Sequence, residues 1–290
     1  MFKGIFTAIV TPFNNGKIDE KAYRDLIEWQ IQEGIHGLVP CGTTGESVTL
    51  SDVEWEHVIE ITLEQVSNRI PIIAGAGSNC TEKAVKLTKK AYKLGVAATL
   101  QVTPYYNKPT QEGLYEHFKA IAKAADLPVV LYNVPGRTSV NILPETTARL
   151  SRIENIVGIK EASGDLEQIK KTKKMVSEDF AILSGEDAQN LAIYELGGVG
   201  AISVTSNILP AKVSDVWNIF ESGDKDGAKF IQEELQPVNK ALFIETSPIP
   251  VKTSLAMMGR IKEEFRLPLT RMGPENKKKL IETLKGYRLV

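Results

Sequence analysis

The chain of 290 residues has little cysteine and histidine, and neither is spaced like a set of metal ligands. Its two cysteines, Cys41 and Cys80, are too few for a disulfide scaffold and form no CxxC motif. The three histidines, His36, His57 and His117, are scattered along the chain. These absences predict a protein of a reducing compartment without a metal site.

The sequence also lacks a strong net charge and a long apolar run. A formal net charge of -1 and a pI near 6.4 give no reason to expect nucleic acid or an anionic membrane as a partner. No stretch reaches the roughly 18 apolar residues of a membrane span. The short apolar run near the N-terminus is broken by Pro12, Asn14 and Asn15, and no cleavage pattern follows it. We therefore expect a cytoplasmic location.

What the sequence does contain is a repeated alternation of two patterns. Eight short β-branched apolar runs end in Gly, Pro or polar residues, and a longer segment with helical periodicity follows each of them. The runs are GIFTAIVTP, IHGLVPCG, IPIIAGAG, VAATLQVTP, LPVVLYNVP, NIVGIKEAS, FAILSGED and VGAISVTSN. Nearly continuous apolar strands in such a series predict an α/β protein with a parallel sheet closed as a (β/α)8 TIM barrel. An open doubly wound sheet is the alternative, but no GxGxxG or GxxxxGK[ST] turn follows any run.

Helical patterns fill the remainder of the chain. Ser51 and Glu54 have the spacing of a capping box at the start of one helical segment. After Asn207 only helical patterns follow, and no low-complexity linker separates them. We expect the catalytic barrel over residues 1–223 and a C-terminal helical appendage over residues 224–290.

Polar residues gather at the ends of the predicted strands. In a (β/α)8 barrel the C-terminal ends of the strands and the loops after them build the active site. These ends read GTTGE, TPYYN, YNVPGRT, GIKEAS, SGED and AISVTSN. We interpret them as parts of one site.

Lys160 interrupts an otherwise apolar strand. Side-chain alternation places it on the strand face of Gly158 and Ala162, whose small side chains leave space for a ligand. A lysine at a strand end commonly just extends to solvent, but this position and these neighbours favour a functional role. Removal from water lowers the pKa of a lysine and supplies the neutral amine that attacks a carbonyl to form a Schiff base.

Other strand-end residues are candidate partners of this amine. Tyr132 shares a strand face with Val130 and Val134, so its hydroxyl can reach the same mouth, although a buried tyrosine is commonly only a packed ring. The GTTGE loop offers backbone N–H groups and hydroxyls to a carboxylate. Arg137 could bind a second carboxylate or form only a surface salt bridge.

Six motifs in this order resemble the dihydrodipicolinate synthase family: GTTGES, TPYYN, YNVPGRT, GIKEASGD, LSGEDA and PIPVK. The resemblance covers essentially the whole chain. This family is part of the pyruvate-dependent class I aldolase superfamily, which includes N-acetylneuraminate lyase. GxxGE and the lysine strand are shared across the superfamily, whereas YNVPGRT and TPYYN are more specific. The resemblance implies condensation of pyruvate with L-aspartate 4-semialdehyde to 4-hydroxy-tetrahydrodipicolinate, in the diaminopimelate and lysine pathway.

The resemblance also implies which residues carry the chemistry. Lys160 forms an imine with pyruvate, so no cofactor is needed. Tyr132, Thr43 and Tyr106 relay protons, with Tyr106 expected from a neighbouring subunit. A site shared in this way implies at least a dimer, and the family is usually a homotetramer, a dimer of dimers.

Substrate-binding residues are implied at matching positions. Thr43 and Thr44 hold the carboxylate of pyruvate, and Arg137 holds the carboxylate of the semialdehyde. The backbone around Gly185 and Ile202 lines the pocket.

The family's pocket for the feedback inhibitor lysine is altered in this sequence. Inhibited members have a histidine after GTTGES, a basic or aromatic contact one turn on, and a glutamate that binds the ammonium of the inhibitor. The corresponding residues here are Asp52, Trp55 and Lys83, and the matching contacts are Ser47, Asn79 and Tyr105. Lys83 would repel an ammonium, so we expect weak or absent feedback inhibition by lysine.

Two other interpretations stay open. The first is another pyruvate-dependent aldolase that takes a sugar-acid or sialic-acid substrate, although a polyol acceptor would not need Arg137. The second is a non-catalytic barrel that binds a keto acid. The combination of Lys160, Tyr132, Thr43 and Tyr106 argues against it, because a binding protein needs no proton relay.

Overall fold

The computed structural model describes residues 2–290. It divides into two compact units, which are described separately. Unit 1 comprises the N-terminal residues up to Gly4 together with Pro71–Ile202. Unit 2 comprises Ile5–Ile70 and Ser203–Val290.

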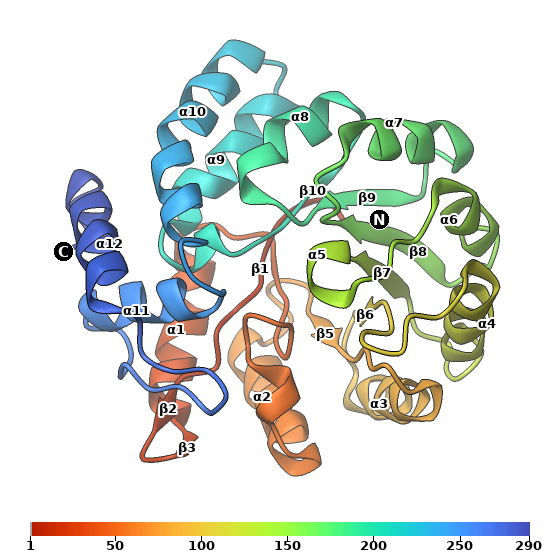
Figure 1. Cartoon of the computed structure of the whole chain (residues 1–290), viewed down its shortest axis with the longest axis horizontal. Helices are drawn as coiled ribbons and strands as arrows, with labels where there is room; N and C mark the ends of the chain where they lie inside the picture. Colours follow the sequence, from red (N-terminus) through yellow and green to blue (C-terminus); the bar gives the residue numbers. More distant parts are fainter. Residues whose placement is uncertain (1) are drawn as a thin grey trace. The chain divides into compact units, whose positions relative to one another are not determined.

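Unit 1 is built on parallel strands. They are β5 (Ile73–Gly75), β6 (Ala98–Val102), β7 (Val129–Asn133), β8 (Ile156–Glu161), β9 (Ala181–Ser184) and β10 (Gly200–Ser203), whose last residue belongs to unit 2. Each strand pairs in parallel with the next in this order. Figure 1 shows β6, β7 and β8 side by side. Their carboxyl ends therefore lie at one edge of the sheet.

Helices cover one face of this sheet. They are α3 (Thr81–Leu94), α4 (Gln111–Ala122), α6 (Pro144–Leu150), α7 (Leu166–Met175) and α8 (Asn190–Glu195). The short helix α5 (Pro135–Thr138) and the single 3-10 turn η2 (Asp187–Gln189) instead follow the carboxyl ends of β7 and β9. Leu114, Phe118 and Ile121 lie on one side of α4 and pack in a buried cluster with Leu131 of β7 and Ile159 of β8. The helical period of three to four residues and the strand period of two thus meet in one apolar core.

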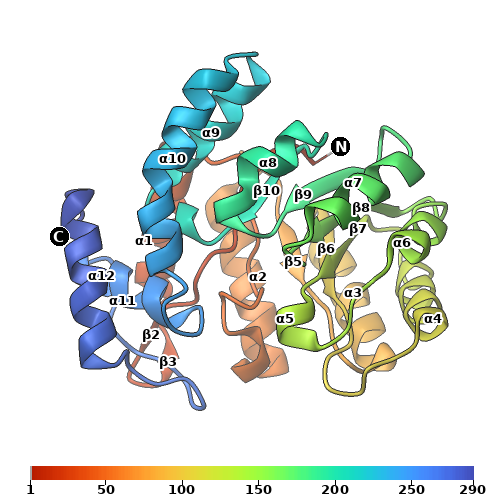
Figure 2. The same ribbon diagram turned by 45° about the horizontal axis from the view of Figure 1, so that its top comes forward.

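Unit 2 contains the first strands of the chain and its C-terminal helices. The elements are β1 (Gly4–Thr7), whose first residue belongs to unit 1, β2 (Phe13–Asn14), β3 (Lys17–Ile18), α1 (Glu20–Gln32), β4 (Gly37–Leu38), η1 (Ser47–Thr49), α2 (Asp52–Val66), η3 (Thr205–Asn207), α9 (Pro210–Glu221), α10 (Lys225–Ala241), α11 (Ile249–Met257) and α12 (Pro274–Gly286). β1 and β4 pair in parallel. Figure 2 shows α10 beside α9, and α12 packs against both α10 and α11.

Local signals account for several element boundaries. The predicted capping box is present at the start of α2: the Glu54 amide donates to Ser51 Oγ at 3.2 Å, and the Ser51 amide donates to Glu54 Oε2 at 2.9 Å. The antiparallel β2–β3 hairpin was not predicted, because its residues look only like the break after the first apolar run. Asn15 and Gly16 form its two-residue turn with φ angles of 53° and 77°. An Asn-Gly pair is a common hairpin signal because both residues tolerate positive φ.

The predicted fold class is confirmed. Each of the eight apolar runs contains one parallel strand, with β1 and β4 in unit 2 and β5 to β10 essentially in unit 1. Their alternation with helices defines an α/β TIM barrel followed by C-terminal helices. The division expected at residue 223 falls between α9 and α10 and stays a prediction. Among residues 2–290, no helix has both the length and the apolar content that membrane crossing requires.

Candidate active site

The carboxyl ends of β7 and β8 bring Lys160 and Tyr132 together. The two residues are partners in the parallel register of these strands. The preceding pair, Leu131 and Ile159, packs in the helix-covered core, so Tyr132 and Lys160 lie on the opposite face. Lys160 Nζ lies 4.3 Å from the centroid of the Tyr132 ring. The structure therefore places the proposed nucleophile beside its proposed proton-relay partner.

Lys160 is buried and has no salt-bridge partner. Lys160 is 6% exposed, and Tyr132 is 7% exposed. Of the salt bridges formed within residues 2–290, none involves Lys160. Its charge does act on Glu186, whose pKa is raised by burial and by the neighbouring Asp187 and is lowered in part by Lys160. An amine without a carboxylate contact is available to a substrate.

Gly185, which follows β9, leaves the space that the Lys160 side chain fills. Its amide donates to the Glu161 carbonyl oxygen at 2.7 Å. A Cβ at position 185 would lie 2.9 Å from Lys160 Cε and 2.7 Å from Ala162 Cβ. Only a glycine fits here without displacing the lysine. Ile202, also implied by the resemblance, is buried on β10, the next strand after β9.

Arg137 and Tyr106 lie beyond the strand ends, Arg137 in the short helix α5 and Tyr106 in the loop after β6. Arg137 is an exposed residue of α5, whose Thr138 accepts a hydrogen bond from Thr103 Oγ1 at 3.1 Å and so ties the helix to the end of β6. Tyr106 is 89% exposed and has a φ of 74°, which is rare for a residue with a side chain. Little of the Tyr106 side chain is therefore covered by its own chain.

Thr43 and Thr44 belong to the GTTGE loop of unit 2. Gly45 and Glu46 of this loop, and Ser47 directly after it, donate their backbone N–H groups to the carbonyl oxygens of Gly42 and Thr43. The N–H groups of Thr43 and Thr44 themselves donate to no acceptor among the residues described. Two consecutive unpaired N–H groups suit the oxygens of an anion such as a carboxylate.

A polar network behind the strand ends escaped prediction. The buried Glu161 carboxylate accepts hydrogen bonds from Asn133 Nδ2 at 3.0 Å, the Ser163 amide at 2.9 Å and Gln168 Nε2 at 3.2 Å. Burial raises the pKa of Glu161. Because Asn133 and Glu161 are the next register pair after Tyr132 and Lys160, the network also fixes the strand ends that carry the site. The sequence signal for this network was the position of Glu161 on the core-facing side of its strand, where a carboxylate needs hydrogen-bond donors.

A second feature that sequence reasoning missed is the buried salt bridge between Lys252 and Glu46 in unit 2. Lys252 lies in the PIPVK motif and Glu46 in the GTTGE motif. Nothing in the sequence indicated that these two motifs are in contact. Within the described part of the chain, no group of three or more His, Cys, Asp or Glu side chains is arranged to hold a metal ion.

Comparison with known proteins agrees with this fold and with the motifs. Residues 1–287 match the dihydrodipicolinate synthetase family. A curated 4-hydroxy-tetrahydrodipicolinate synthase of Thermodesulfovibrio yellowstonii is 59% identical over 290 residues, which cover 100% of both chains. The crystal structure of the Thermotoga maritima dihydrodipicolinate synthase has a TM-score of 0.98 and 46% identity, with 100% of both chains covered. A synthase of Cyanidioschyzon merolae, solved with lysine bound, has a TM-score of 0.97 and 40% identity, with 100% of this chain and 99% of that one covered.

By fold, the chain is a TIM-barrel enzyme with additional C-terminal helices. It belongs to the dihydrodipicolinate synthetase family, as the match over nearly its whole length shows. The resemblance drawn from six motifs is thereby confirmed, and the relatives' shared activity supports the same reaction class for this enzyme.

Proposed function

We propose that this enzyme condenses pyruvate with L-aspartate 4-semialdehyde to 4-hydroxy-tetrahydrodipicolinate in diaminopimelate and lysine biosynthesis. The family and the full-length relatives of that name support the reaction. The observation that carries the mechanism is the Lys160 amine, which is buried, forms no salt bridge within residues 2–290 and lies 4.3 Å from the Tyr132 ring centroid. A lysine amine in such a place can form a covalent imine with a keto acid.

The proposed reaction needs no redox change. The Lys160 amine attacks the keto carbon of pyruvate, and loss of one water leaves an imine. Loss of a methyl proton gives an enamine, whose carbon forms the new bond to the aldehyde carbon while the aldehyde oxygen takes up a proton. The amino group derived from the semialdehyde then displaces Lys160 from the imine carbon, which closes the ring and frees the enzyme amine. We therefore expect no cofactor beyond the covalent imine.

Side chains around the amine supply proton transfer and orientation in this proposal. Tyr132, Thr43 and Tyr106 pass the protons that the imine and carbon-bond steps release and consume. Thr43 and Thr44 hold the pyruvate carboxylate. Their unpaired backbone N–H groups, which can donate to its oxygens, support this role.

Two further contacts complete the proposed substrate site. Arg137 binds the semialdehyde carboxylate from α5, where a planar guanidinium can form two parallel hydrogen bonds. The backbone at Gly185 and Ile202 lines the pocket beside Lys160, which the close approach of Gly185 to Lys160 Cε supports.

A substrate comparison tests this function. We expect the purified enzyme to consume pyruvate with aspartate semialdehyde and not with N-acetylmannosamine, and the Lys160→Met variant to be inactive. The matched control, Lys171→Met, removes an exposed lysine that pairs with Glu145 on the helix side and should keep full activity. Turnover of N-acetylmannosamine alone would indicate a sialic-acid type aldolase. Pyruvate binding without turnover of either aldehyde would indicate a keto-acid-binding barrel.

We also propose a homotetramer, a dimer of dimers, in which Tyr106 serves the site of a neighbouring subunit. The 89% exposure of Tyr106 in its own chain supports this role. Coexpressed Lys160→Met and Tyr106→Phe chains should regain activity, because a mixed pair holds one site with both side chains intact. Mixed dimers that stay inactive would contradict the shared site. The partners are small molecules, and we propose a cytoplasmic location without a nucleic-acid or membrane role.

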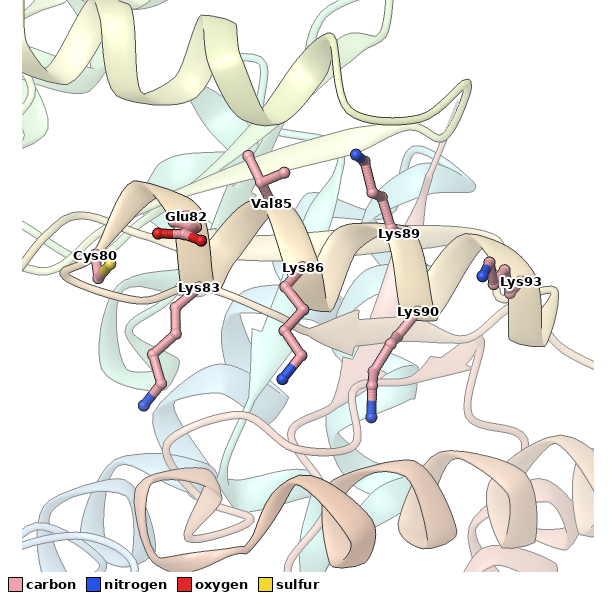
Figure 3. A pocket seen from close by; sticks show the side chains of 8 residues that line it. All are labelled: Cys80, Glu82, Lys83, Val85, Lys86, Lys89, Lys90 and Lys93. Carbon is pink, nitrogen blue, oxygen red and sulfur yellow. The ribbon is translucent and has the colours of Figure 1, made fainter.

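Weak or absent inhibition by lysine is the last part of the proposal. Figure 3 shows Lys83, Lys86 and Lys90 extending from one side of α3, so an effector ammonium would meet a positive helix face. These residues belong to a groove of about 520 Å³ along α3. The enzyme should keep its activity at sub-millimolar lysine, and Lys83→Glu should gain sensitivity. Inhibition of the unmodified enzyme at that concentration would refute the expectation.

A further inference from the structure

Lys252 of α11 and Glu46 of the GTTGE loop form an ion pair in the interior of unit 2. Their side chains are 0% and 1% exposed. Lys252 Nζ also lies 4.4 Å from the ring centroid of Phe13 and 5.2 Å from that of Phe265. Burial lowers the pKa of Lys252, and the contact with Glu46 opposes that effect. The ammonium is thus enclosed by rings and neutralised by one carboxylate.

The other oxygen of Glu46 is held by the same C-terminal region. The backbone N–H of Arg266 donates to Glu46 Oε2 at 3.2 Å. The Arg266 guanidinium donates to the Thr49 carbonyl oxygen at 3.0 Å and to Glu54 Oε2 at 2.8 Å. Residues 46–54 are therefore fastened at successive points by residues 252–266.

The GTTGE loop needs such support because its backbone is unusual. Glu46 has φ 53° and ψ 35°, a left-handed conformation that disfavours residues with a side chain. Gly45 is enclosed, since a Cβ there would lie 3.1 Å from the Ile9 carbonyl oxygen, and its own carbonyl accepts a hydrogen bond from Thr11 Oγ1 at 2.8 Å. The loop between these anchors presents the unpaired N–H groups of Thr43 and Thr44.

We propose that Glu46 and Lys252 are positioning residues for the first substrate. Their ion pair fixes residues 42–46 so that the N–H groups of Thr43 and Thr44 meet the carboxylate of the keto acid. The inference rests on the proposed function, which supplies pyruvate as the ligand of these N–H groups. It also gives the C-terminal helices a role in substrate binding, because α11 carries Lys252.

A buried ion pair such as Lys252–Glu46 is better suited to fixing the position of the backbone than to stabilising the fold. Removing two charges from water is costly, and apolar residues of similar volume often stabilise a protein as well or better. A carboxylate held by one ammonium and one backbone N–H, by contrast, permits few orientations of its own backbone. Loss of the pair should therefore weaken pyruvate binding even in a protein that stays folded.

The double variant Glu46→Gln/Lys252→Met separates position from stability, because it leaves no unpaired buried charge. We expect its thermal midpoint to lie closer to the wild type than that of either single variant. Its KM for pyruvate should rise roughly tenfold or more, the range expected for weakened hydrogen bonds to a charged group, while kcat changes less. A KM for pyruvate within about twofold of the wild type would overturn the inference.

Two conservative variants and one control complete the test. Lys252→Arg keeps the charge and should retain most of the pyruvate affinity, whereas Glu46→Asp shortens the pair and should raise KM even if the double variant does not fold. Lys277→Met breaks the Lys277–Glu263 pair of the same region and should leave the KM for pyruvate unchanged. Equal KM values for Glu46→Asp, Lys277→Met and the wild type would also overturn the inference.

Borohydride trapping distinguishes this inference from the function on which it rests. At saturating pyruvate, both the wild type and the double variant should form a reduced adduct, and only the pyruvate concentration for half-maximal trapping should differ. If the double variant forms the adduct at the same half-maximal pyruvate concentration as the wild type, the positioning role is rejected and the proposed function stands. A wild type that forms no adduct rejects the proposed function as well.

Discussion

Lys160 in unit 1 and Lys252 in unit 2 are both buried, at 6% and 0% exposure, and both lie over an aromatic ring. Nζ is 4.3 Å from the Tyr132 centroid in the first case and 4.4 Å from the Phe13 centroid in the second. They differ in their partners, because Lys252 is paired with Glu46 and Lys160 has no salt bridge among residues 2–290.

The difference shows how one chain can use two buried amines in opposite ways. A carboxylate beside an ammonium stabilises its charged form and occupies its hydrogen-bonding capacity, so Lys252 is suited to a structural contact. Lys160 lies at a strand end next to a glycine that makes room for it. Burial alone therefore does not mark a nucleophile, and the partner of the amine decides between the two roles.

Removing the unpaired amine should have the largest effect. Lys160→Met deletes the nucleophile, so the reaction should slow by more than the roughly 10⁴-fold that loss of a proton-transfer group can cost. Steady-state turnover of pyruvate with aspartate semialdehyde measures this. If Lys160→Met kept more than about 10⁻² of the wild-type activity, a group other than Lys160 would have to be the nucleophile.

Removing the hydroxyl beside that amine should have the next largest effect. Tyr132→Phe keeps the ring under Lys160 Nζ and deletes only the proton-transfer group, so kcat/KM should fall by about 10²–10⁴-fold. Tyr92→Phe, at an exposed tyrosine of α3, is the matched control. Equal kinetics in the two variants would show that Tyr132 is only a packed ring.

Breaking the paired lysine should instead affect folding. Lys252→Met leaves the buried Glu46 carboxylate without its ammonium, which should cost about 3–5 kcal/mol of unfolding free energy. Urea denaturation of the variant and the wild type measures the difference. A loss of stability as small as that of an exposed pair, at most about 1 kcal/mol, would show that the charges matter little to each other.

Crowding the unpaired lysine should have an intermediate effect on activity. In Gly185→Ala the new methyl group would meet Lys160 Cε at 2.9 Å and displace the amine, so kcat/KM should fall by roughly 10²-fold. Gly286→Ala, where a Cβ meets nothing within 4 Å, is the control. Unimpaired turnover in Gly185→Ala would mean that Lys160 does not react from this position.

The smallest of the expected effects concerns the ion pair between Arg266 and Glu54, close to the paired lysine. It should appear as a pH dependence of the free energy of unfolding. Hydrogen bonds from Arg266 lower the pKa of Glu54 from 4.5 to about 2. A lowered carboxyl pKa stabilises the fold above the unfolded value, and this contribution is lost as pH falls from about 4.5 towards 2. Glu54→Gln should therefore cost about 2 kcal/mol near neutral pH, allowing for partial exposure, and progressively less in acid. A cost that is independent of pH would contradict this origin.

Local patterns made much of the molecule predictable. The eight apolar runs, the capping box at Ser51 and the strand-face alternation around Lys160 depend only on neighbours in sequence. Parallel pairing then places Tyr132 opposite Lys160 in register, which the position of both residues at strand ends already indicated.

The contacts that define the difference between the two lysines could not be predicted in this way. Glu46 and Lys252 are 206 positions apart, and nothing local to either residue specifies the other. The Glu161 network likewise joins residues from two strands and a helix. The β2–β3 hairpin had a local Asn15-Gly16 signal, but the short run on each side was too weak to indicate strands.

The most direct test of the unpaired-amine role is to locate the covalent adduct. The enzyme is incubated with pyruvate, reduced with borohydride, digested, and the lysine-containing peptides are mapped by mass spectrometry. The proposed chemistry predicts the mass of a reduced pyruvate adduct on the peptide with Lys160 and none on the peptide with Lys252. An adduct on Lys252 or another lysine, or no adduct at all, would contradict it.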